Sequence, residues 1–333
     1  METSGQRIAR VCSILGLGLW LAAAAIGLPK ATAQAVYPNR SVRIVVPYGA
    51  GGVADITVRV VAEKLGDKLG QRFVVENSPG AGGIAAARNA LSGGTDGYTL
   101  TLLTNGTSIS VPLFKSLPFD LVKDFVPISS LGYFDFNLAV NTSSPFRTLE
   151  NFLQAARAKP GVLNVGTVNV GSSQNLSAEL FRTSADIKFT IVPYRTTPEV
   201  LVALLRDDVQ LVVDSYAGLK SALVDQKIRV VASSGKTRSQ ILPDVPTALE
   251  LGIAGFEVDA WNGLFAPAGT APDVVATLNQ ALHDVLADPA TKKQTLELGI
   301  EAKASSPEEL RGRVRADIEK WSGVIARAGI PKQ

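Results

Sequence analysis

The 333-residue chain contains a single cysteine, a single methionine and a single histidine. One cysteine cannot form an intrachain disulfide, and one residue of each kind cannot build a thiolate or histidine cluster for a metal. Cys12 and Met1 both lie near the N-terminus, in a stretch that we expect to be removed. A serine–histidine–aspartate mechanism would have to use His283. That residue flanks an apolar helical stripe, which predicts a solvated position outside any active site. The stripe comprises Val275, Leu278, Leu282 and Val285.

Charge is also sparse and evenly mixed. Charged residues make up 19% of the chain, with 33 lysines and arginines against 30 acidic residues, and the net charge is +3. No long run of like charges occurs, so the sequence indicates no basic surface for a nucleic acid and we expect no such partner. With 46% hydrophobic residues the composition is typical of a globular protein, and the length suffices for two domains.

The N-terminal segment has the features of an export signal. Arg7 and Arg10 precede an apolar run over Val11–Leu28, and small-x-small cleavage sites follow within residues 31–35. A membrane anchor is the alternative, because the run approaches the length that spans a bilayer. Its alanine content and its small-residue exit favour cleavage. We therefore predict that residues 1–33 form a signal peptide and that the mature chain is exported.

Strand and helix patterns alternate along the rest of the chain. An apolar strand over Val42–Pro47 is followed by a glycine-rich turn and an amphipathic helix over Val53–Leu69. Further strands are predicted at 73–75 and 98–103, and a second series of strands and helices occupies residues 149–232. Such alternation is typical of βαβ units. We therefore predict two α/β lobes with mostly parallel sheets, followed by C-terminal helices.

Capping signals predict where two of the helices begin. Thr197 followed by Pro198 has the pattern of an N-cap with proline at the first helical position. Ser306 and Glu309 have the spacing of a capping box, with Pro307 at the first position of a C-terminal helix. The pattern alone leaves open whether the C-terminal helices return to the first lobe.

Two glycine-rich loops each follow a strand and open a helix. The first is Pro47–Gly52, and the second lies within Gly166–Ser173. Glycines let backbone N–H groups approach a ligand, and the free N–H groups and dipole of a helix N-terminus favour an anion. Each loop can also be a plain tight turn, with Ser172 or Ser173 capping the helix. Because both series carry such a loop, we predict that two helix N-termini clamp a carboxylate from opposite sides.

The first loop also has part of a dinucleotide-binding pattern. Gly49-x-Gly51-x-x-Ala54 follows a strand, and Glu76 ends the next strand, where a ribose-binding acid would lie. An exported NAD(P)-dependent oxidoreductase is therefore the alternative function. Against it, a proline and a tyrosine separate the strand from the glycines, and the same spacing recurs from Gly80. An export signal also places the protein where soluble dinucleotides are scarce.

Segments spread in order along the predicted mature chain carry a family resemblance. They are Arg43–Asp55, Glu76–Gly83, Asp96–Leu100, Leu117–Asp120, Lys123–Phe125, Val192–Arg195, Leu242–Thr247 and Trp261–Thr270. These segments resemble those of the tripartite tricarboxylate transporter receptors, also called the Bug family. The chain departs from the family pattern at Tyr48–Ala50, Asn175 and Thr196. These departures leave the ligand open and do not affect the predicted fold.

The resemblance implies a type II periplasmic binding-protein fold, with two α/β lobes joined by hinge strands near Phe136–Val140 and Glu257–Trp261. Residues 36–137 and 260–333 would form the first lobe, and residues 138–259 the second. Such a protein is a periplasmic solute receptor that uses no cofactor or metal and catalyses no reaction. We expect a monomer that captures a small organic carboxylate for uptake or sensing, with the membrane subunits of a tripartite transporter as partners.

Candidate ligand contacts lie in the two loops and at neighbouring strand ends. Neither loop contains lysine or arginine, so recognition would depend on N–H groups, hydroxyls and helix dipoles. In the first lobe the candidates are Tyr48, Gly51, Gly52, Asp55, Asn105, Thr107 and Ser108. In the second lobe they are Thr167, Gly171, Ser172, Ser173, Arg195, Asp214 and Ser215.

Three of the candidates carry a charge, and each has two interpretations. Asp55 can contact the ligand or can merely suit the dipole in a first helical turn. Arg195 can reach the ligand or can stay exposed beside a helix cap. Asp214 would repel a carboxylate, so it would bind an amine or a hydroxyl of the ligand. This leaves amino acids and hydroxy acids open as ligands.

We expect the mature chain to begin near Gln34 or Val36, because the small-x-small sites end there. The intact mass of the protein recovered from periplasmic extract measures this directly. A species that keeps residues 1–33 and stays in the membrane fraction would contradict the signal-peptide prediction.

Overall fold

A computed structural model describes residues 37–327 and 329–333 of the chain. The predicted signal peptide, residues 1–33, lies outside this part. Residues Pro38–Gln333 form one compact unit. Within the described residues, no helix combines the length and the apolar character needed to cross a bilayer.

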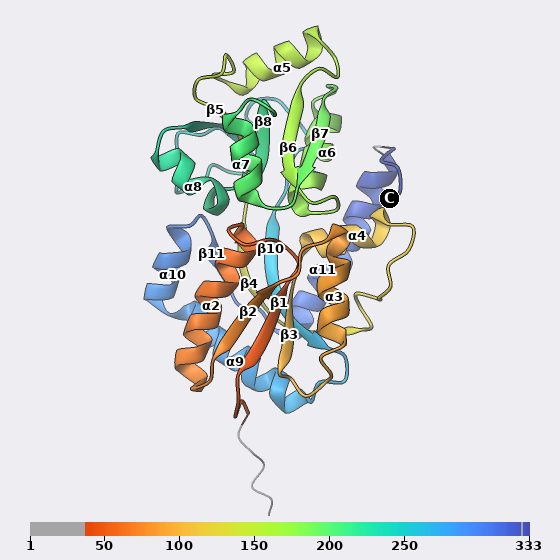
Figure 1. Cartoon of the computed structure of the whole chain (residues 1–333), viewed down its shortest axis with the longest axis vertical. Coiled ribbons are helices and arrows are strands. Elements are labelled where there is room, and N and C mark those ends of the chain that lie inside the picture. The colour runs from red at the N-terminus through yellow and green to blue at the C-terminus, as the bar shows by residue number, and fades with distance from the viewer. Residues whose placement is uncertain (1–36, 328) are drawn as a thin grey trace, which may run out of the picture. The chain divides into compact units, whose positions relative to one another are not determined.

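Two mixed sheets organise this unit (Figure 1). The first has six strands in the order β11-β4-β10-β3-β1-β2. Its strands are β1 (Val42–Val46), β2 (Phe73–Asn77), β3 (Thr99–Thr104), β4 (Phe125–Phe134), β10 (Ala260–Pro267) and β11 (Glu301–Ala302). Its helices are α2 (Val53–Leu69), the short 3-10 helix η1 (Ala81–Gly83), α3 (Ile84–Leu91), α4 (Asn105–Leu113), α9 (Pro272–Ala287), α10 (Pro289–Leu296) and α11 (Pro307–Arg327). We call this part of the structure the first lobe.

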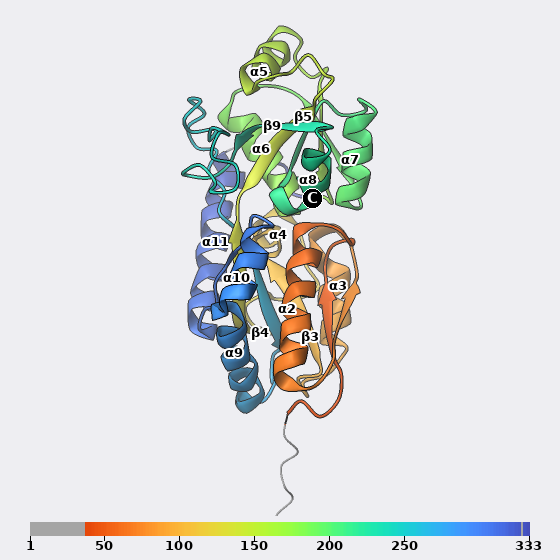
Figure 2. The same cartoon turned by 90° about the vertical axis from the view of Figure 1, so that its left-hand side faces the viewer.

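The second lobe surrounds a five-stranded sheet in the order β7-β6-β8-β5-β9. Its strands are β5 (Phe136–Asn141), β6 (Asn164–Val168), β7 (Thr190–Tyr194), β8 (Leu211–Ser215) and β9 (Ile228–Ser233). Its helices are α5 (Leu149–Ala158), α6 (Ser173–Ser184), α7 (Thr197–Leu205) and α8 (Tyr216–Val224). Figures 1 and 2 show these helices grouped around the second sheet. The prediction of two α/β lobes is confirmed.

The expectation of mostly parallel sheets is wrong. β1 pairs in parallel with β2 and β3, but β10 runs antiparallel to both β3 and β4. In the second sheet β6 is parallel to β7 and β8, whereas β5 is antiparallel to β8 and β9. β11, within the first lobe, also runs antiparallel to β4; the other antiparallel pairs involve strands that lead into or out of a lobe. The alternating strand–helix pattern describes only the βαβ units within each lobe.

Each sheet has a glycine-rich loop at the carboxyl end of a strand that lies between two parallel neighbours. In the first, β1 lies between β2 and β3, and in the second, β6 lies between β7 and β8. The crossover helices therefore diverge at the carboxyl ends of β1 and β6, which is where open α/β sheets bind ligands. The glycine-rich loops begin at these two ends. The fold thus gives each lobe one loop of the predicted kind at its switch point.

The C-terminal helices pack on the first lobe, which answers the question that the pattern left open. α9 and α11 contact β4, and α11 also lies along α4. The indole N–H of Trp261 on β10 donates to Asp317 Oδ2 on α11 at 2.6 Å. The predicted capping box of α11 is confirmed, because Glu309 N donates to Ser306 Oγ at 3.2 Å and Ser306 N to Glu309 Oε2 at 2.7 Å.

The chain passes between the lobes twice. It crosses first at Asp135, which separates β4 from β5, and it returns over residues 234–259. Phe136 N donates to Ser234 Oγ at 3.0 Å, so the two crossings are bonded to each other. The predicted boundary after residue 137 falls inside β5, and the one before residue 260 coincides with the start of β10. The residue ranges of the lobes stay a prediction.

Asp135 is surrounded by other acids. Burial, and then the charges of Asp259, Glu257 and Glu301, raise the pKa of Asp135 to about 6. The folded protein therefore holds a proton on this carboxyl at pH values where the unfolded chain, with a pKa of about 3.9, has released it.

We expect the free energy of unfolding to contain a component that falls as pH rises from about 4 to above 6, because Asp135 loses its proton in this window. Urea unfolding of the wild type and of Asp135→Asn across this range measures the difference between them. The exposed Asp244→Asn serves as the control for removing a carboxylate. A difference between wild type and Asp135→Asn that does not change with pH would contradict the expectation.

Candidate functional site

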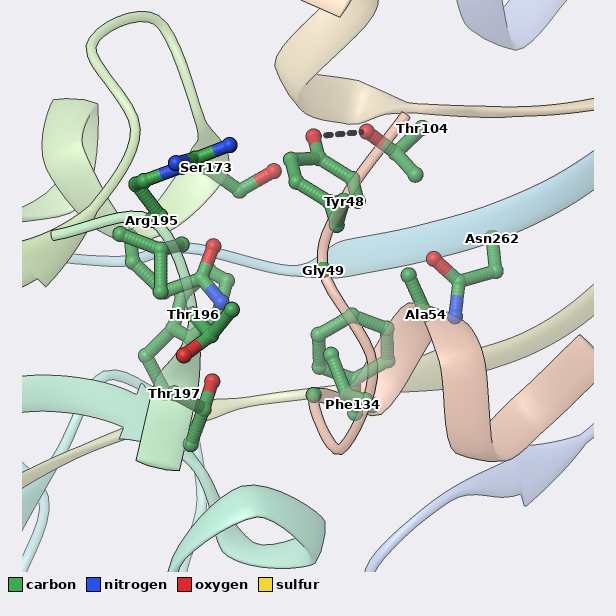
Figure 3. Close-up of a pocket in the computed structure, with 15 residues that line it drawn as sticks. Tyr48, Gly49, Ala54, Thr104, Phe134, Ser173, Arg195, Thr196, Thr197 and Asn262 are labelled. Carbon is green, nitrogen blue, oxygen red and sulfur yellow. Dashed lines mark hydrogen bonds between the residues drawn. The ribbon is translucent and has the colours of Figure 1, made fainter. Parts of the chain in front are cut away.

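A small pocket lies where the two lobes meet, with a volume of about 20 Å³ (Figure 3). The first lobe contributes the loop after β1, the start of α2 and the ends of β3, β4 and β10. The second contributes the start of β5, the end of β6, the starts of α6 and α7 and the loop between β7 and α7. The lining residues are Tyr48, Gly49, Gly52, Val53, Ala54, Thr104, Phe134, Phe136, Val168, Ser173, Gln174, Arg195, Thr196, Thr197 and Asn262.

Asp55 holds the first glycine-rich loop in shape. Its Oδ2 accepts the N–H of Gly51 at 3.1 Å, and its Oδ1 accepts from Asn77 and Arg59, each at 2.9 Å. Gly51 has φ +87°, a conformation that suits glycine. Burial acts to raise the pKa of Asp55, but the hydrogen bonds from Arg59, Asn77 and Gly51 lower it below its ordinary value. The carboxylate is thus engaged within the first lobe and does not line the pocket.

The N-terminus of α2 is open toward the pocket. Its N-cap is Gly52, which offers no side chain to accept a hydrogen bond. The first N–H groups of a helix have no intrahelical acceptor, so those of Val53 and Ala54 remain available where these residues line the pocket. The partial positive charge of the helix end adds to them. This arrangement favours an anion.

Tyr48 and Thr104 form the wall between α2 and α4. The Tyr48 hydroxyl and Thr104 Oγ1 are 2.9 Å apart (Figure 3). Thr104 is the N-cap of α4 and forms a capping box with Thr107. Burial raises the pKa of the Tyr48 hydroxyl, so it stays protonated at neutral pH. Thr107, as the partner of Thr104 in the capping box, stabilises the start of α4 and does not line the pocket.

In the second lobe, Ser172 is a cap. Its Oγ accepts the N–H of Asn175 at 3.1 Å and donates to Val168 O at 2.8 Å. Asn175 in turn donates to Thr167 Oγ1 at 3.2 Å and accepts the N–H of Gly171 at 3.3 Å. Thr167, Gly171 and Ser172 therefore shape the turn, whereas Ser173 presents its side chain to the pocket.

Asp214 is fully buried and bonded on several sides. It accepts from Thr197 Oγ1 at 2.8 Å, Ser215 N at 2.7 Å and Gln174 Nε2 at 3.3 Å. Burial raises its pKa, and these hydrogen bonds oppose that rise. Asp214 is not a lining residue. It instead positions Thr197 and Gln174, which do line the pocket, while Ser215 caps α8 by accepting from Gly218 N.

Arg195 is the one charged residue among those that line the pocket. Its backbone N–H donates to Glu199 Oε2 at 3.0 Å, and its exposed guanidinium forms no ion pair within residues 37–327 and 329–333. The predicted cap at Thr197 is wrong by one residue. Thr196 is the N-cap of α7, because its Oγ1 accepts the N–H of Glu199 at 3.3 Å, and Thr197 is the first helical residue.

The lobes touch one another around the pocket. Ser173 Oγ donates to Asn105 Oδ1 at 2.6 Å, Ser110 Oγ to Gly171 O at 3.4 Å and Gly82 N to Val170 O at 3.4 Å. This set joins α4 and η1 of the first lobe to the second glycine-rich loop. A fourth bond, from the Lys220 side chain to Glu297 O at 2.9 Å, joins α8 to the end of α10. The structure is therefore a closed form.

Glycines permit this approach. A Cβ on Gly49 would lie 2.4 Å from Thr196 Cγ2, across the pocket. A Cβ on Gly106, at the start of α4, would lie 2.8 Å from the Tyr48 hydroxyl oxygen and 2.9 Å from both Ser173 N and Ser173 Oγ. Contacts this short do not occur for real side chains, so any larger residue at these positions would hold the lobes apart.

The structure brings four of the predicted residues to the pocket: Tyr48, Gly52, Ser173 and Arg195. Gly51 lies beside it, where a Cβ would approach Pro198 Cγ at 3.2 Å. Asn105 lies at the lobe contact. Gly171 lies at the same lobe contact, where its carbonyl accepts from Ser110 Oγ. The remaining candidates are buried within one lobe and do not line the pocket: Asp55, Thr107, Ser108, Thr167, Ser172, Asp214 and Ser215.

Sequence reasoning missed several lining residues, chiefly Thr197, Gln174 and Asn262. Gln174 directly follows Ser173, so the helix-start argument that selected Ser173 could have included it. Asn262 lies within a segment that carries the family resemblance, and its polar amide among apolar strand residues was an available signal. Its place opposite Thr104 depends on antiparallel pairing of β10 with β3, which no local pattern shows.

A family model described as "Tripartite tricarboxylate transporter family receptor" matches residues 57–330. The chain belongs to this family. Among solved structures, the periplasmic binding protein BugD is 29% identical, with a TM-score of 0.85, over 89% of this chain and 100% of that one. The predicted periplasmic binding-protein fold and the Bug resemblance are confirmed.

Two further solved structures that are similar to this chain were determined with a ligand. Rpa4515 of R. palustris, determined with adipate, is 31% identical, with a TM-score of 0.86, over 89% of this chain and 99% of that one. MatC from Rhodopseudomonas palustris, with bound malate, is 32% identical, with a TM-score of 0.82, over 87% of this chain and 100% of that one.

The oxidoreductase alternative has no support from these relatives, and the structure offers a physical reason against it. Glu76, the proposed ribose-binding acid, is bonded to Arg43 at 3.1 Å and accepts from Asn89 at 2.9 Å. Gly49 and Gly51, which would have to admit a pyrophosphate, are instead covered by Thr196 and Pro198 of the other lobe. These two glycines instead leave room for the other lobe to approach.

We expect Gly106→Ala to weaken ligand binding, because the added methyl group would press on Tyr48 and Ser173 in the closed form. Overpacking of this kind costs about 1–3 kcal/mol, which is roughly a 5- to 150-fold loss of affinity. Calorimetric titration with the carboxylate that stabilises the wild type most would measure it. Gly312→Ala, on an exposed face of α11 with nothing within 4 Å, is the matched control. Equal affinities of the Gly106→Ala variant and the wild type would contradict the closure argument.

Proposed function

We propose that this protein is an exported periplasmic receptor that binds a small organic carboxylate between its two lobes, for uptake or sensing, and that it catalyses no reaction. The observation that carries the proposal is the electrostatic character of the pocket. Helix N-termini from both lobes open on it, and its one charged lining residue is Arg195. Such a pocket favours a negative charge.

The positions of the nearby acids support the same ligand class. Asp55 and Asp214 are each bonded within their own lobe, so neither presents a carboxylate to the ligand. Asp214, which we expected to bind an amine or a hydroxyl of the ligand, instead bonds within its own lobe to Gln174, Thr197 and Ser215. The adipate and malate in the two structural relatives are consistent with a carboxylate ligand here.

Binding requires the lobes to move. A pocket of about 20 Å³ has room for little more than one water molecule. A carboxylate of several carbons can enter only when the lobes separate, and it then contacts both when they close. We place the lobes at residues 36–137 with 260–333 and at residues 138–259, so that the motion turns about Asp135 and the returning segment.

The lining residues also support a receptor without turnover. They include no acid, histidine or cysteine that could act as a general base or a nucleophile. His283 lies exposed on α9 and does not line the pocket. We propose a monomer that works without cofactor or metal and that delivers its ligand to the membrane subunits of a tripartite transporter.

We expect a thermal-shift screen to find a carboxylate that raises the melting temperature, and we expect Arg195→Ala to weaken its binding by about tenfold, since hydrogen bonds to charged groups contribute about 1.5–3 kcal/mol and Arg195 is exposed. Arg157→Ala, an exposed arginine on α5, is the control and should bind as the wild type does.

Small-angle scattering should show a smaller radius of gyration at ligand saturation. The proposed function would be wrong if NAD or NADP stabilised the protein while no carboxylate did. Recovery of the ligand chemically altered at a catalytic rate would refute the absence of turnover.

A further inference from the structure

Asn262 places a buried amide at the wall of the pocket. It lies on β10, paired with Thr104 of β3 on one side and with Gly132 of β4 on the other. Its side chain is fully buried and reaches the pocket beside Ala54, at the start of α2 (Figure 3). β10 is the central strand of the first sheet, so the position of this amide is held by pairing on both sides.

The hydrogen bonds of a neighbouring threonine determine which way the amide faces. Thr57 Oγ1 has one proton, and it donates that proton to Val53 O at 2.6 Å, four residues earlier on α2. The atom of Asn262 that lies 3.0 Å from Thr57 Oγ1 must therefore be the donor, Nδ2. An amide turned the other way would set two acceptors against each other. Oδ1 consequently faces away from Thr57.

Asn262 Oδ1 has no hydrogen-bond partner among residues 37–327 and 329–333. A buried carbonyl oxygen without a donor costs about 1–3 kcal/mol, and such atoms are uncommon in native proteins. The Nδ2 atom of the same amide does have a partner, because it donates to Thr57 Oγ1. Because Asn262 lines the pocket, the missing donor can come from a bound molecule.

The charge around the pocket decides what kind of donor fits. An ammonium group would enter a space bordered by helix N-termini and by Arg195, with no carboxylate among the lining residues. Both features disfavour a positive charge. A hydroxyl donates equally well and brings no charge. The pocket therefore suits a neutral donor attached to an anionic ligand.

We propose that the ligand is a 2-hydroxycarboxylate and that Asn262 Oδ1 accepts the hydrogen bond of its hydroxyl group. The inference rests on the proposed carboxylate-binding function and narrows the ligand class. Asn262, Val53 and Ala54 all line the same small pocket, so we assign the hydroxyl to the carbon next to the carboxylate. Thr57 acts as a positioning residue, since it keeps the acceptor turned toward the ligand.

Matched pairs of acids that differ only in the hydroxyl test the proposal. The probes are lactate against propionate, malate against succinate, and 2-hydroxyadipate against adipate, with aspartate as the ammonium counterpart of malate. Calorimetric titration of the mature protein gives each dissociation constant. We expect the hydroxy acid of the best-binding pair to bind about tenfold more tightly than its partner, and aspartate to bind more weakly than malate.

Two substitutions assign the preference to Asn262. Asn262→Val removes the acceptor, and Thr57→Val removes the group that orients the amide while leaving Asn262 in place. In both variants the ratio of the two dissociation constants should fall toward one. A merely structural effect would weaken both acids alike and leave the ratio unchanged. Asn279→Val is the control, because Asn279 donates to Ile128 O and Ser305 O in the same lobe and does not line the pocket.

The outcomes separate this inference from the proposed function. If no acid of any pair binds, the proposed function itself fails. If the acids bind but the hydroxyl makes no difference, the assignment of a 2-hydroxycarboxylate is wrong while the receptor function stands. A hydroxyl preference that survives undiminished in both Asn262→Val and Thr57→Val would also overturn it, because another group would then recognise the hydroxyl.

Discussion

Helix N-termini of both lobes face the same small space, and their partial positive charges repel one another across it. α2 approaches without a side-chain cap, and α6 and α7 approach from the other lobe, with Arg195 adding a full charge. An anion between them removes this repulsion and lets the lobes come together. Much of the surrounding structure supports the contact between the lobes. Asp55 and Asp214 hold the loops and helix starts, and Gly49 and Gly106 leave room for contact.

The lobes and most helices could be predicted because each has a local signal. The strand before a glycine turn, the amphipathic stripe of α2 and the capping box at Ser306 depend on residues close in sequence. β4 had no such signal. Its buried Ser129 and Ser130 break the apolar pattern of a core strand. Their hydrogen-bond partners lie far along the chain: Ser130 donates to Lys303 O and Ser305 Oγ, and Ser129 Oγ accepts from Ser305 N. Hydrogen-bond partners so far apart in the sequence cannot be inferred from the residues next to the strand.

The residues of the candidate site likewise divide into those with a local sequence signal and those without one. Tyr48, Gly52 and Ser173 lie next to helix starts that the sequence marks, and they reach the pocket. Asp214 is a carboxylate at the end of a strand, and this position predicted a ligand contact. Only the fold shows that Thr197, Gln174 and Ser215 surround it with donors. Asn262 comes from a strand that is added to the sheet after the whole second lobe, so its neighbours could not be inferred.

The single residue between β4 and β5 limits how the lobes move. Asp135 alone separates β4 of the first sheet from β5 of the second, and Phe136 is bonded to the returning segment. A link of one residue spans about 3.8 Å, so it cannot allow the lobes to slide past each other by much. Opening must then be a rotation about this point, with the largest displacement at the surface farthest from it. In the proposed delivery to membrane subunits, the loaded and the empty receptor would then differ by an angle between two rigid surfaces.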